Sequence, residues 1–166
     1  ILLPRMAPGE VDYECELAIV IGKRAKHVPA AHALDYVLGY TCANDVSARD
    51  VQNREDTQWA RAKSFDTFAP LGPWIETELN PLRCGISTRV NGRVMQQCST
   101  ELMIFPIPRL IHWLSQCMTL LPGTVILTGT PAGCGFAQTP PLWLHPGDVV
   151  EVEVEGVGVL RNPVQA

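Results

Sequence analysis

The amino-acid sequence predicts a β-rich α+β domain. Short segments that alternate in polarity or are rich in β-branched residues outnumber segments with apolar residues at helical spacing. Only one segment, 107–118, has the spacing of a longer helix. No repeat, low-complexity block or linker divides the 166 residues. We therefore expect a single domain over residues 1–166.

The first strand is predicted for Glu14 to Ile21, which is rich in β-branched residues and ends before Gly22. Because side chains alternate along a strand, Glu14 and Glu16 should lie on the same face. Both glutamates have apolar neighbours in the sequence. This segment is therefore the first candidate for a buried pair of carboxylates.

The next elements are a short helix, predicted over 30–37, and a second strand, predicted over 40–47. Alternation along this strand would place three side chains on one face, namely Thr41, Ala43 and Asp45. Asp45 is thus a candidate to join the two glutamates of the first strand.

Proline and glycine punctuate 68–74, which predicts a rigid loop that leads into a strand through Ile75. Asn91-Gly92 lies between two strand-like segments, 87–90 and 93–96. An Asn-Gly pair in this position is a strong signal for a β-hairpin. The sequence therefore predicts a hairpin with its turn at these two residues.

The one clear helix is predicted over 107–118, where apolar residues recur at helical spacing and the first turn contains prolines. A short apolar strand over 125–127 precedes a glycine-containing loop over 128–133. A last strand, over 149–155, alternates valine with glutamate. These segments complete the strand-rich pattern.

Composition excludes several classes of function. The chain has seventeen acidic and thirteen basic residues and no run of Lys or Arg, so the sequence shows no sign of a basic surface that would bind nucleic acid. No apolar stretch approaches the roughly 20 residues needed to span a membrane. Six scattered cysteines without a C-x-x-C pair predict reduced thiols. We therefore expect a cytoplasmic protein, or a mitochondrial one in a eukaryote.

Glu14 and Glu16 would present two carboxylates to one place, which is costly unless a cation or a proton compensates them. With Asp45 they would form an all-oxygen ligand set, which suits Mg²⁺, with Mn²⁺ or Ca²⁺ as alternatives. The competing interpretation is that both glutamates face water on a half-exposed strand. Glutamates of the last predicted strand are expected to do so.

Four further residues have suitable chemistry. Arg49 and Gln52 are three apart, as on one side of a helical turn, and could bind a carboxylate; the alternative is a surface pair of Arg49 with its neighbour. Lys63 lies between aromatic residues and could stabilise a developing negative oxygen, or simply be exposed. Thr130 belongs to the loop over 128–133, which offers hydroxyl and N–H groups to an anion.

Four segments in order resemble the fumarylacetoacetate hydrolase family. They are DYECELAIVIG at 12–22, GYTCANDVSARD at 39–50, KSFDTF followed by PLGP over 63–73, and LTGTPAG at 127–133. The match runs across nearly the whole chain. The resemblance implies the mixed β-roll of that family, a β-sandwich with a few short helices, and a homodimer.

The resemblance also implies roles for single residues. Glu14, Glu16 and Asp45 match the family's carboxylate ligands for Mg²⁺ or a similar ion. Lys63 matches a lysine beside the metal that orients the substrate or the attacking water. The substrate-binding positions of the family are matched by Arg49, Gln52 and Thr130.

The function implied is that of a metal-dependent hydrolase. It would cleave a C–C bond in a β-diketo acid similar to acylpyruvate or fumarylpyruvate through a metal-stabilised enolate. One alternative is a decarboxylase, isomerase or tautomerase acting on oxaloacetate or on a substrate like 2-hydroxyhepta-2,4-diene-1,7-dioate. Another alternative is a non-catalytic domain that keeps the metal site.

Single-domain members of the family carry a histidine and a glutamate upstream of this region, in a segment that closes over the substrate and acts as the base. Nothing in the sequence matches that segment. We therefore expect a domain without its N-terminal lid or N-terminal domain, which binds metal but has low activity by itself. If a base is present within the chain, Asp66 and the nearby histidines are the first candidates.

Overall fold

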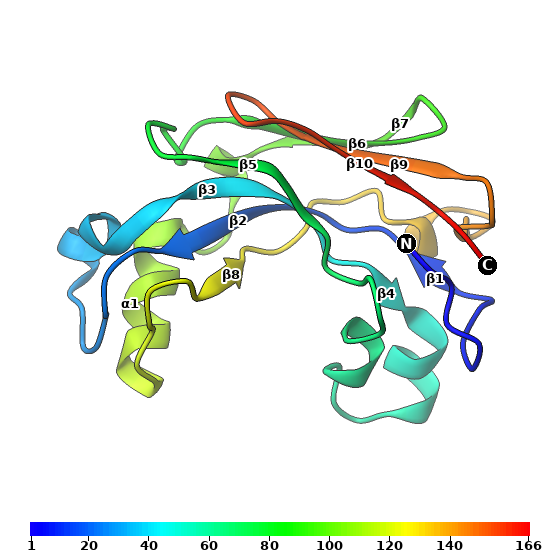
Figure 1. Cartoon of the computed structure of the whole chain (residues 1–166), viewed down its shortest axis with the longest axis horizontal. Helices are drawn as coiled ribbons and strands as arrows, with labels where there is room; N and C mark the ends of the chain where they lie inside the picture. Colours follow the sequence, from blue (N-terminus) through cyan, green and yellow to red (C-terminus); the bar gives the residue numbers. More distant parts are fainter.

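The computed structural model describes residues 1–166 and consists mainly of two four-stranded antiparallel sheets (Figure 1). The strands are β1 (Val11–Asp12), β2 (Cys15–Ile21), β3 (Val37–Asn44), β4 (Ser47–Ala48), β5 (Leu71–Glu76), β6 (Gly85–Val90), β7 (Arg93–Ser99), β8 (Val125–Leu127), β9 (Val149–Val154) and β10 (Gly158–Pro163). The predicted β-rich α+β class is confirmed.

Helical segments are few and short. The α-helix is α1 (Ile107–Cys117), a π-helical turn covers Val51–Glu55, and 3-10 helices cover Ala30–Tyr36, Arg61–Lys63, Thr100–Leu102 and Gly135–Ala137. The expected helix over 30–37 is therefore a 3-10 helix. None of the helices combines the length and the apolar character needed to cross a membrane.

One sheet has the strand order β5-β3-β2-β8 and the other has the order β10-β9-β6-β7. Figure 1 shows the second sheet lying over the first, with α1 on the far side of the first sheet. A separate two-stranded pair, β1 with β4, continues beyond the ends of β2 and β3. The segments 10–16 and 43–48 therefore lie side by side, first where β1 pairs with β4 and then where β2 pairs with β3.

The hydrophobic core lies between the two sheets and is contacted by one face of β2. Alternate residues of this strand, Cys15, Leu17 and Ile19, belong to the main core cluster together with Val152 of β9. Glu16 lies between Cys15 and Leu17 in sequence and therefore points away from that core. Glutamates at i and i+2 share the opposite face, as the alternation predicts.

The second strand ends earlier than the sequence predicts. It stops at Asn44 instead of continuing to residue 47, because the Val46 N–H donates to the Asn44 carbonyl at 2.8 Å and turns the chain. Asp45 therefore lies in a tight turn and not on the strand. Its N–H still donates to the Glu14 carbonyl at 2.9 Å, which keeps the two residues adjacent.

Two other expectations have different outcomes. The hairpin is confirmed, with Asn91 at φ 51° and Gly92 at φ 79° in the turn between β6 and β7. The rigid loop expected over 68–74 is wrong in its second half, because β5 begins at Leu71 and pairs with Ala43 of β3. The sheet hydrogen bonds outweigh the local preference of glycine and proline for loops there.

All six cysteines are free thiols, as the absence of any paired spacing predicts. Two of them, Cys15 and Cys42, lie on neighbouring strands in the core. Burial raises the pKa of Cys15 to about 12. These thiols therefore behave as small apolar side chains.

The loop that follows β8 is packed too tightly for a larger residue at Gly135. A Cβ there would lie 2.6 Å from Asp12 Oδ1 and closer still to the Leu142 carbonyl oxygen. We expect Gly135→Ala to lower the free energy of unfolding by about 1–3 kcal/mol, as overpacking does. Gly9→Ala, which meets nothing within 4 Å, is the matched control and should leave the melting temperature unchanged. Equal melting temperatures of both variants would contradict the tight packing.

Candidate functional site

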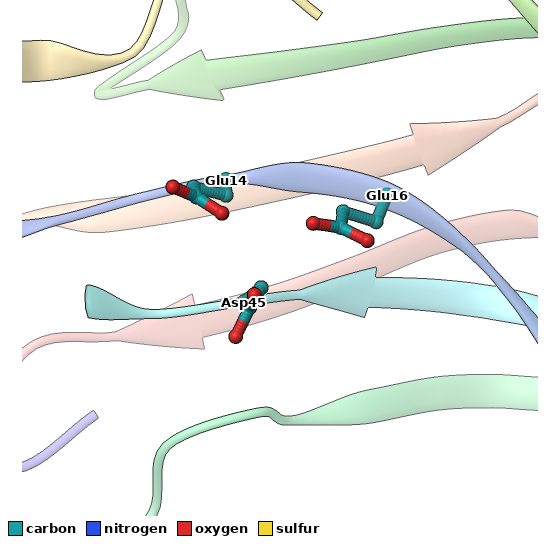
Figure 2. A group of neighbouring side chains, drawn as sticks. All are labelled: Glu14, Glu16 and Asp45. Carbon is teal, nitrogen blue, oxygen red and sulfur yellow. The ribbon is translucent and has the colours of Figure 1, made fainter. Parts of the chain in front are cut away.

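Three carboxylates meet where the first sheet continues into the β1–β4 pair. Glu14 precedes β2, Glu16 belongs to it, and Asp45 lies in the turn after β3 (Figure 2). One oxygen of each lies within 4.8 Å of the others. The three residues are only 8%, 3% and 9% exposed. The structure thus brings together the three residues that alternation and chemistry single out, although Asp45 reaches the group from a turn.

Glu16 is the most deeply buried of the three. Its Oε2 atom accepts a hydrogen bond of 2.6 Å from the Gly129 N–H in the loop after β8. Desolvation raises the pKa of Glu16 to about 8, and the neighbouring carboxylates of Asp45 and Glu14 add to this effect. The charged form of Glu16 therefore needs a nearby cation.

Lys63 supplies one positive charge from the end of the 3-10 helix over Arg61–Lys63. Its Nζ atom lies 2.9 Å from Glu14 Oε2, 3.0 Å from Ser47 Oγ and in direct contact with Asp45 Oδ2. Burial lowers the pKa of Lys63, but the bonds to Asp45 and Glu14 outweigh this and raise it. The lysine is therefore a cation held at the carboxylates and not a freely exposed side chain.

Arg49 supplies the second positive charge. Its Nη2 atom lies 2.6 Å from Glu14 Oε1 and 3.0 Å from Asp12 Oδ2. Its Nη1 atom donates to Gln52 Oε1 at 2.7 Å, as their spacing of three residues predicts. The guanidinium also lies over the Phe136 ring, 4.5 Å from its centre. The alternative of a surface pair with the adjacent Asp50 is wrong.

Asp12 is a site residue that sequence reasoning missed. It is fully buried and accepts hydrogen bonds from Arg49 Nε at 3.0 Å and from the N–H groups of Gly135 at 2.7 Å and Phe136 at 3.1 Å. Desolvation raises its pKa, against the opposing effect of Arg49 and these N–H groups. Asp12 therefore anchors Arg49 to the loop after β8. Extending the alternation of Glu14 and Glu16 by two residues would have found it.

A cleft of about 650 Å³ opens over these groups. Its lining includes the three carboxylates, Arg49, Gln52, Lys63, the loop from Gly129 to Cys134 and Phe136. Thr130 lies in that loop, and its Oγ1 atom accepts a hydrogen bond of 2.8 Å from Gln96 Nε2. All seven predicted site residues thus line one cleft. Asp66 is exposed and, like the four histidines, is not part of the lining.

The donor atoms of the cleft fit a hard divalent cation. Glu14, Glu16 and Asp45 offer only oxygen, the ligand that Mg²⁺, Mn²⁺ and Ca²⁺ prefer. The cleft contains one thiol, that of Cys134. Burial raises the pKa of this thiol to about 11. This sulfur therefore stays protonated at neutral pH and does not compete as a ligand.

Comparison with known proteins identifies relatives over nearly the whole chain. The family model described as fumarylacetoacetate (FAA) hydrolase C-terminal matches residues 1–165. Oxaloacetate tautomerase Fahd2a, mitochondrial, of Rattus norvegicus is 49% identical over 158 residues, which is 93% of this chain and 50% of that protein. Across the curated relatives compared, the chain spans between 50% and 66% of their length.

Solved structures that share the fold include two enzymes. One is described as 5-carboxymethyl-2-hydroxymuconate delta-isomerase from Mycobacterium smegmatis, with a TM-score of 0.92 and 54% identity over 99% of this chain and 62% of that one. The other is described as fumarylacetoacetate hydrolase from Exiguobacterium antarcticum, with a TM-score of 0.93 and 46% identity over 95% and 57% of the two chains. The predicted family fold is confirmed.

The buried contacts of Asp12 predict a large loss of stability on truncation. Asp12→Ala removes one of the two buried carboxylates that pair with Arg49 and leaves the N–H groups of Gly135 and Phe136 unsatisfied. We expect a loss of about 3–5 kcal/mol in denaturant unfolding. Asp35→Ala removes an exposed carboxylate that pairs only with His32 and should change stability by less than about 0.5 kcal/mol. Similar losses for both variants would contradict the anchoring role.

The raised pKa of Glu16 predicts how stability varies with pH when metal is removed with a chelator. Between its usual pKa of 4.5 and about 8, the folded protein holds a proton on Glu16 that the unfolded chain has lost. Stability should therefore fall by about 3–5 kcal/mol as the pH rises through this range. In the Glu16→Gln variant, the free energy of unfolding measured by denaturant titration should depend less steeply on pH. An equally steep slope in that variant would contradict the assignment.

Proposed function

The chain belongs to the fumarylacetoacetate hydrolase family, and on this premise we propose that it carries the metal and substrate site of an enzyme that enolises small 2-oxo dicarboxylic acids. The observation that carries the proposal is the buried group of Glu14, Glu16 and Asp45 beside Lys63 in an open cleft. Such a concentration of carboxylates suits a divalent cation, which would in turn attract an anionic substrate.

Glu14, Glu16 and Asp45 would hold the metal, for which Mg²⁺ is the first choice and Mn²⁺ or Ca²⁺ the alternatives. A bound divalent ion would act as a Lewis acid on the oxygens of the substrate. The chain itself keeps the three carboxylates in place through the Gly129 N–H, Lys63 and Arg49.

Lys63 is proposed as the catalytic residue. Tautomerisation moves a proton from the carbon beside the carbonyl group to the carbonyl oxygen, which gains negative charge on the way. The ammonium group of Lys63 is held in the cleft by Glu14 and Asp45, and its raised pKa keeps it protonated near neutral pH. It therefore stabilises the charge on that oxygen as a hydrogen-bond donor and keeps its own proton. The proton of the carbon passes to water or to a base of the full-length protein, and from there to the oxygen.

Arg49, Gln52 and Thr130 are proposed to bind the substrate carboxylate. The Nε–H of Arg49 donates to Asp12 and one N–H of Nη1 donates to Gln52, while Nη2 lies within 3.0 Å of carboxylate oxygens of Asp12 and Glu14. One N–H of the guanidinium remains for a ligand. Since Gln52 accepts from Arg49 through its oxygen, its NH₂ group is also free to donate. These donors suit a carboxylate.

Isomerisation or tautomerisation is favoured over the hydrolysis first expected. The rat relative is named an oxaloacetate tautomerase. Of two related structures, one is named a 5-carboxymethyl-2-hydroxymuconate delta-isomerase and the other a 2-hydroxyhepta-2,4-diene-1,7-dioate isomerase. Cleavage of a C–C bond in an acylpyruvate-like acid is the second candidate, because the Exiguobacterium structure is named a hydrolase. Both reactions pass negative charge to the same substrate oxygen. A non-catalytic domain is the outcome if neither reaction is found.

The experiment uses the full-length protein with Mg²⁺. Oxaloacetate is followed by the ultraviolet absorbance of its enol, an acylpyruvate by loss of its β-diketone absorbance, and an unsaturated 2-hydroxy dioate by its isomerisation. We expect the oxaloacetate or dioate reaction to be accelerated more strongly than acylpyruvate cleavage. Acylpyruvate cleavage alone would favour the second candidate. Gel filtration in the same preparation checks the homodimer, which stays a prediction, as do the cytoplasmic location and the single-domain organisation.

Glu16→Gln tests the metal site directly. Removal of one of three charged ligands should weaken Mg²⁺ binding at least tenfold in calorimetry, because the amide keeps the shape but not the charge. Glu101→Gln changes an exposed glutamate outside the cleft and should bind Mg²⁺ like the parent protein. An unchanged affinity of Glu16→Gln would contradict the metal centre.

Lys63→Met tests the catalytic assignment. We expect turnover to fall by about 10² or more, since one such donor is worth a few kcal/mol in the transition state. Mg²⁺ should still bind, because Lys63 is not a ligand. Lys23→Met removes an exposed lysine and serves as the control. Near-normal turnover of Lys63→Met would reduce Lys63 to a structural counter-charge.

A further inference from the structure

Gln96 of β7 lies behind the loop after β8, outside the lining of the cleft, and is only 1% exposed. We propose that Gln96 is a positioning residue that makes the Thr130 hydroxyl a hydrogen-bond donor toward the cleft. The site would thereby select a substrate with a negatively charged oxygen next to Thr130. This inference rests on the proposed function and deepens it.

The orientation of the Gln96 amide is fixed by two backbone groups. Its Oε1 atom accepts from the Cys15 N–H at 3.0 Å, and its Nε2 atom donates to the Pro131 carbonyl oxygen at 2.8 Å. A flipped amide would face an N–H group with another N–H group and a carbonyl with another oxygen. Both contacts would then be lost in a buried place, which is costly. Only one orientation is therefore compatible with the surroundings.

This orientation determines what Thr130 can do. Nε2 lies 2.8 Å from Thr130 Oγ1, and an amide NH₂ group can only donate. The threonine oxygen is therefore the acceptor, and its own proton has to point elsewhere. The Cys134 thiol is nearby, since its Sγ atom lies 3.5 Å from the same Nε2 atom, but sulfur is a weak acceptor. An oxygen of a ligand in the cleft is the stronger partner.

The loop itself lies directly on the strand that carries Gln96. A Cβ atom at Gly133 would lie 3.2 Å from Gln96 Cγ and would collide with the Met95 carbonyl oxygen, so only glycine permits this approach. The Tyr13 hydroxyl donates to the Gly133 carbonyl at 3.1 Å and holds the loop from a second side. The position of Thr130 is therefore fixed together with its hydrogen-bonding role.

The same amide also connects the two halves of the site. Its Oε1 atom accepts a hydrogen bond from the N–H of Cys15, the residue between Glu14 and Glu16. Gln96 thus joins the strand of the carboxylates to the loop of Thr130 through one side chain. A ligand bound next to a cation at the carboxylates would therefore lie at a fixed distance from the Thr130 hydroxyl, which would act as a hydrogen-bond donor to it.

The test is a double-mutant cycle on ligand binding. Oxalate is a suitable probe, because it is a dianion that neither tautomerises nor breaks, and its affinity is measured by calorimetry on the full-length protein with Mg²⁺. We expect Thr130→Val and Gln96→Met each to weaken oxalate about tenfold. If Gln96 acts through Thr130, the double variant should bind no more weakly than either single variant. Mg²⁺ affinity should be unchanged in all three.

Two further variants keep the test decisive. Gln97→Met changes the exposed neighbour and should bind oxalate normally. If Gln96→Met fails to fold, Gln96→Glu keeps an oxygen for the Cys15 N–H but lacks the NH₂ group, and it should weaken oxalate in the parent and not in Thr130→Val. Additive losses, or an unchanged oxalate affinity without Gln96, would overturn this inference alone. A parent protein that binds neither Mg²⁺ nor oxalate would overturn the proposed function and this inference with it.

Discussion

The burial of several carboxylates in one place is the constraint on which the rest of this site depends. Four of them, those of Asp12, Glu14, Glu16 and Asp45, are less than a tenth exposed. Two side-chain cations, Arg49 and Lys63, make all the ion pairs formed with this group. Burial is the main cause of the raised pKa of Glu16, and the negative charge of Asp45 and Glu14 adds to it. This concentration of carboxylates makes a divalent cation the natural counter-charge.

The fold allows this concentration of charge because β2 is buried on both faces. One face carries the apolar residues that join the two sheets, and the other carries Glu16. The sheet around β2 therefore fixes the carboxylates with the rigidity of the core, whereas Lys63 and Thr130 come from short helical and loop segments. Loops that bear functional groups on a rigid sheet are a common arrangement of binding sites.

Sequence reasoning recovered what depends on local periodicity. Alternation by two placed Glu14 and Glu16 together, and a spacing of three brought Arg49 to Gln52. Contacts between distant segments were not accessible in this way. Gln96 meets the Cys15 N–H across 81 positions, and Asp12 meets the Gly135 N–H across 123. The turn at Asp45 was missed as well, because it depends on local hydrogen bonding and not on periodicity.

Charge and hydrogen-bond polarity complement each other in the cleft. The carboxylates would attract a cation, and a cation would in turn attract an anionic substrate, whose oxygens need donors. Three donors of different origin face that need: the remaining N–H of Arg49, the NH₂ group of Gln52 and the hydroxyl of Thr130. The oxygen of Gln52 accepts from Arg49 and the oxygen of Thr130 accepts from Gln96, so that each of these side chains keeps a donor for a ligand. The selection of an anion is therefore determined by residues behind the cleft wall as much as by those that line it.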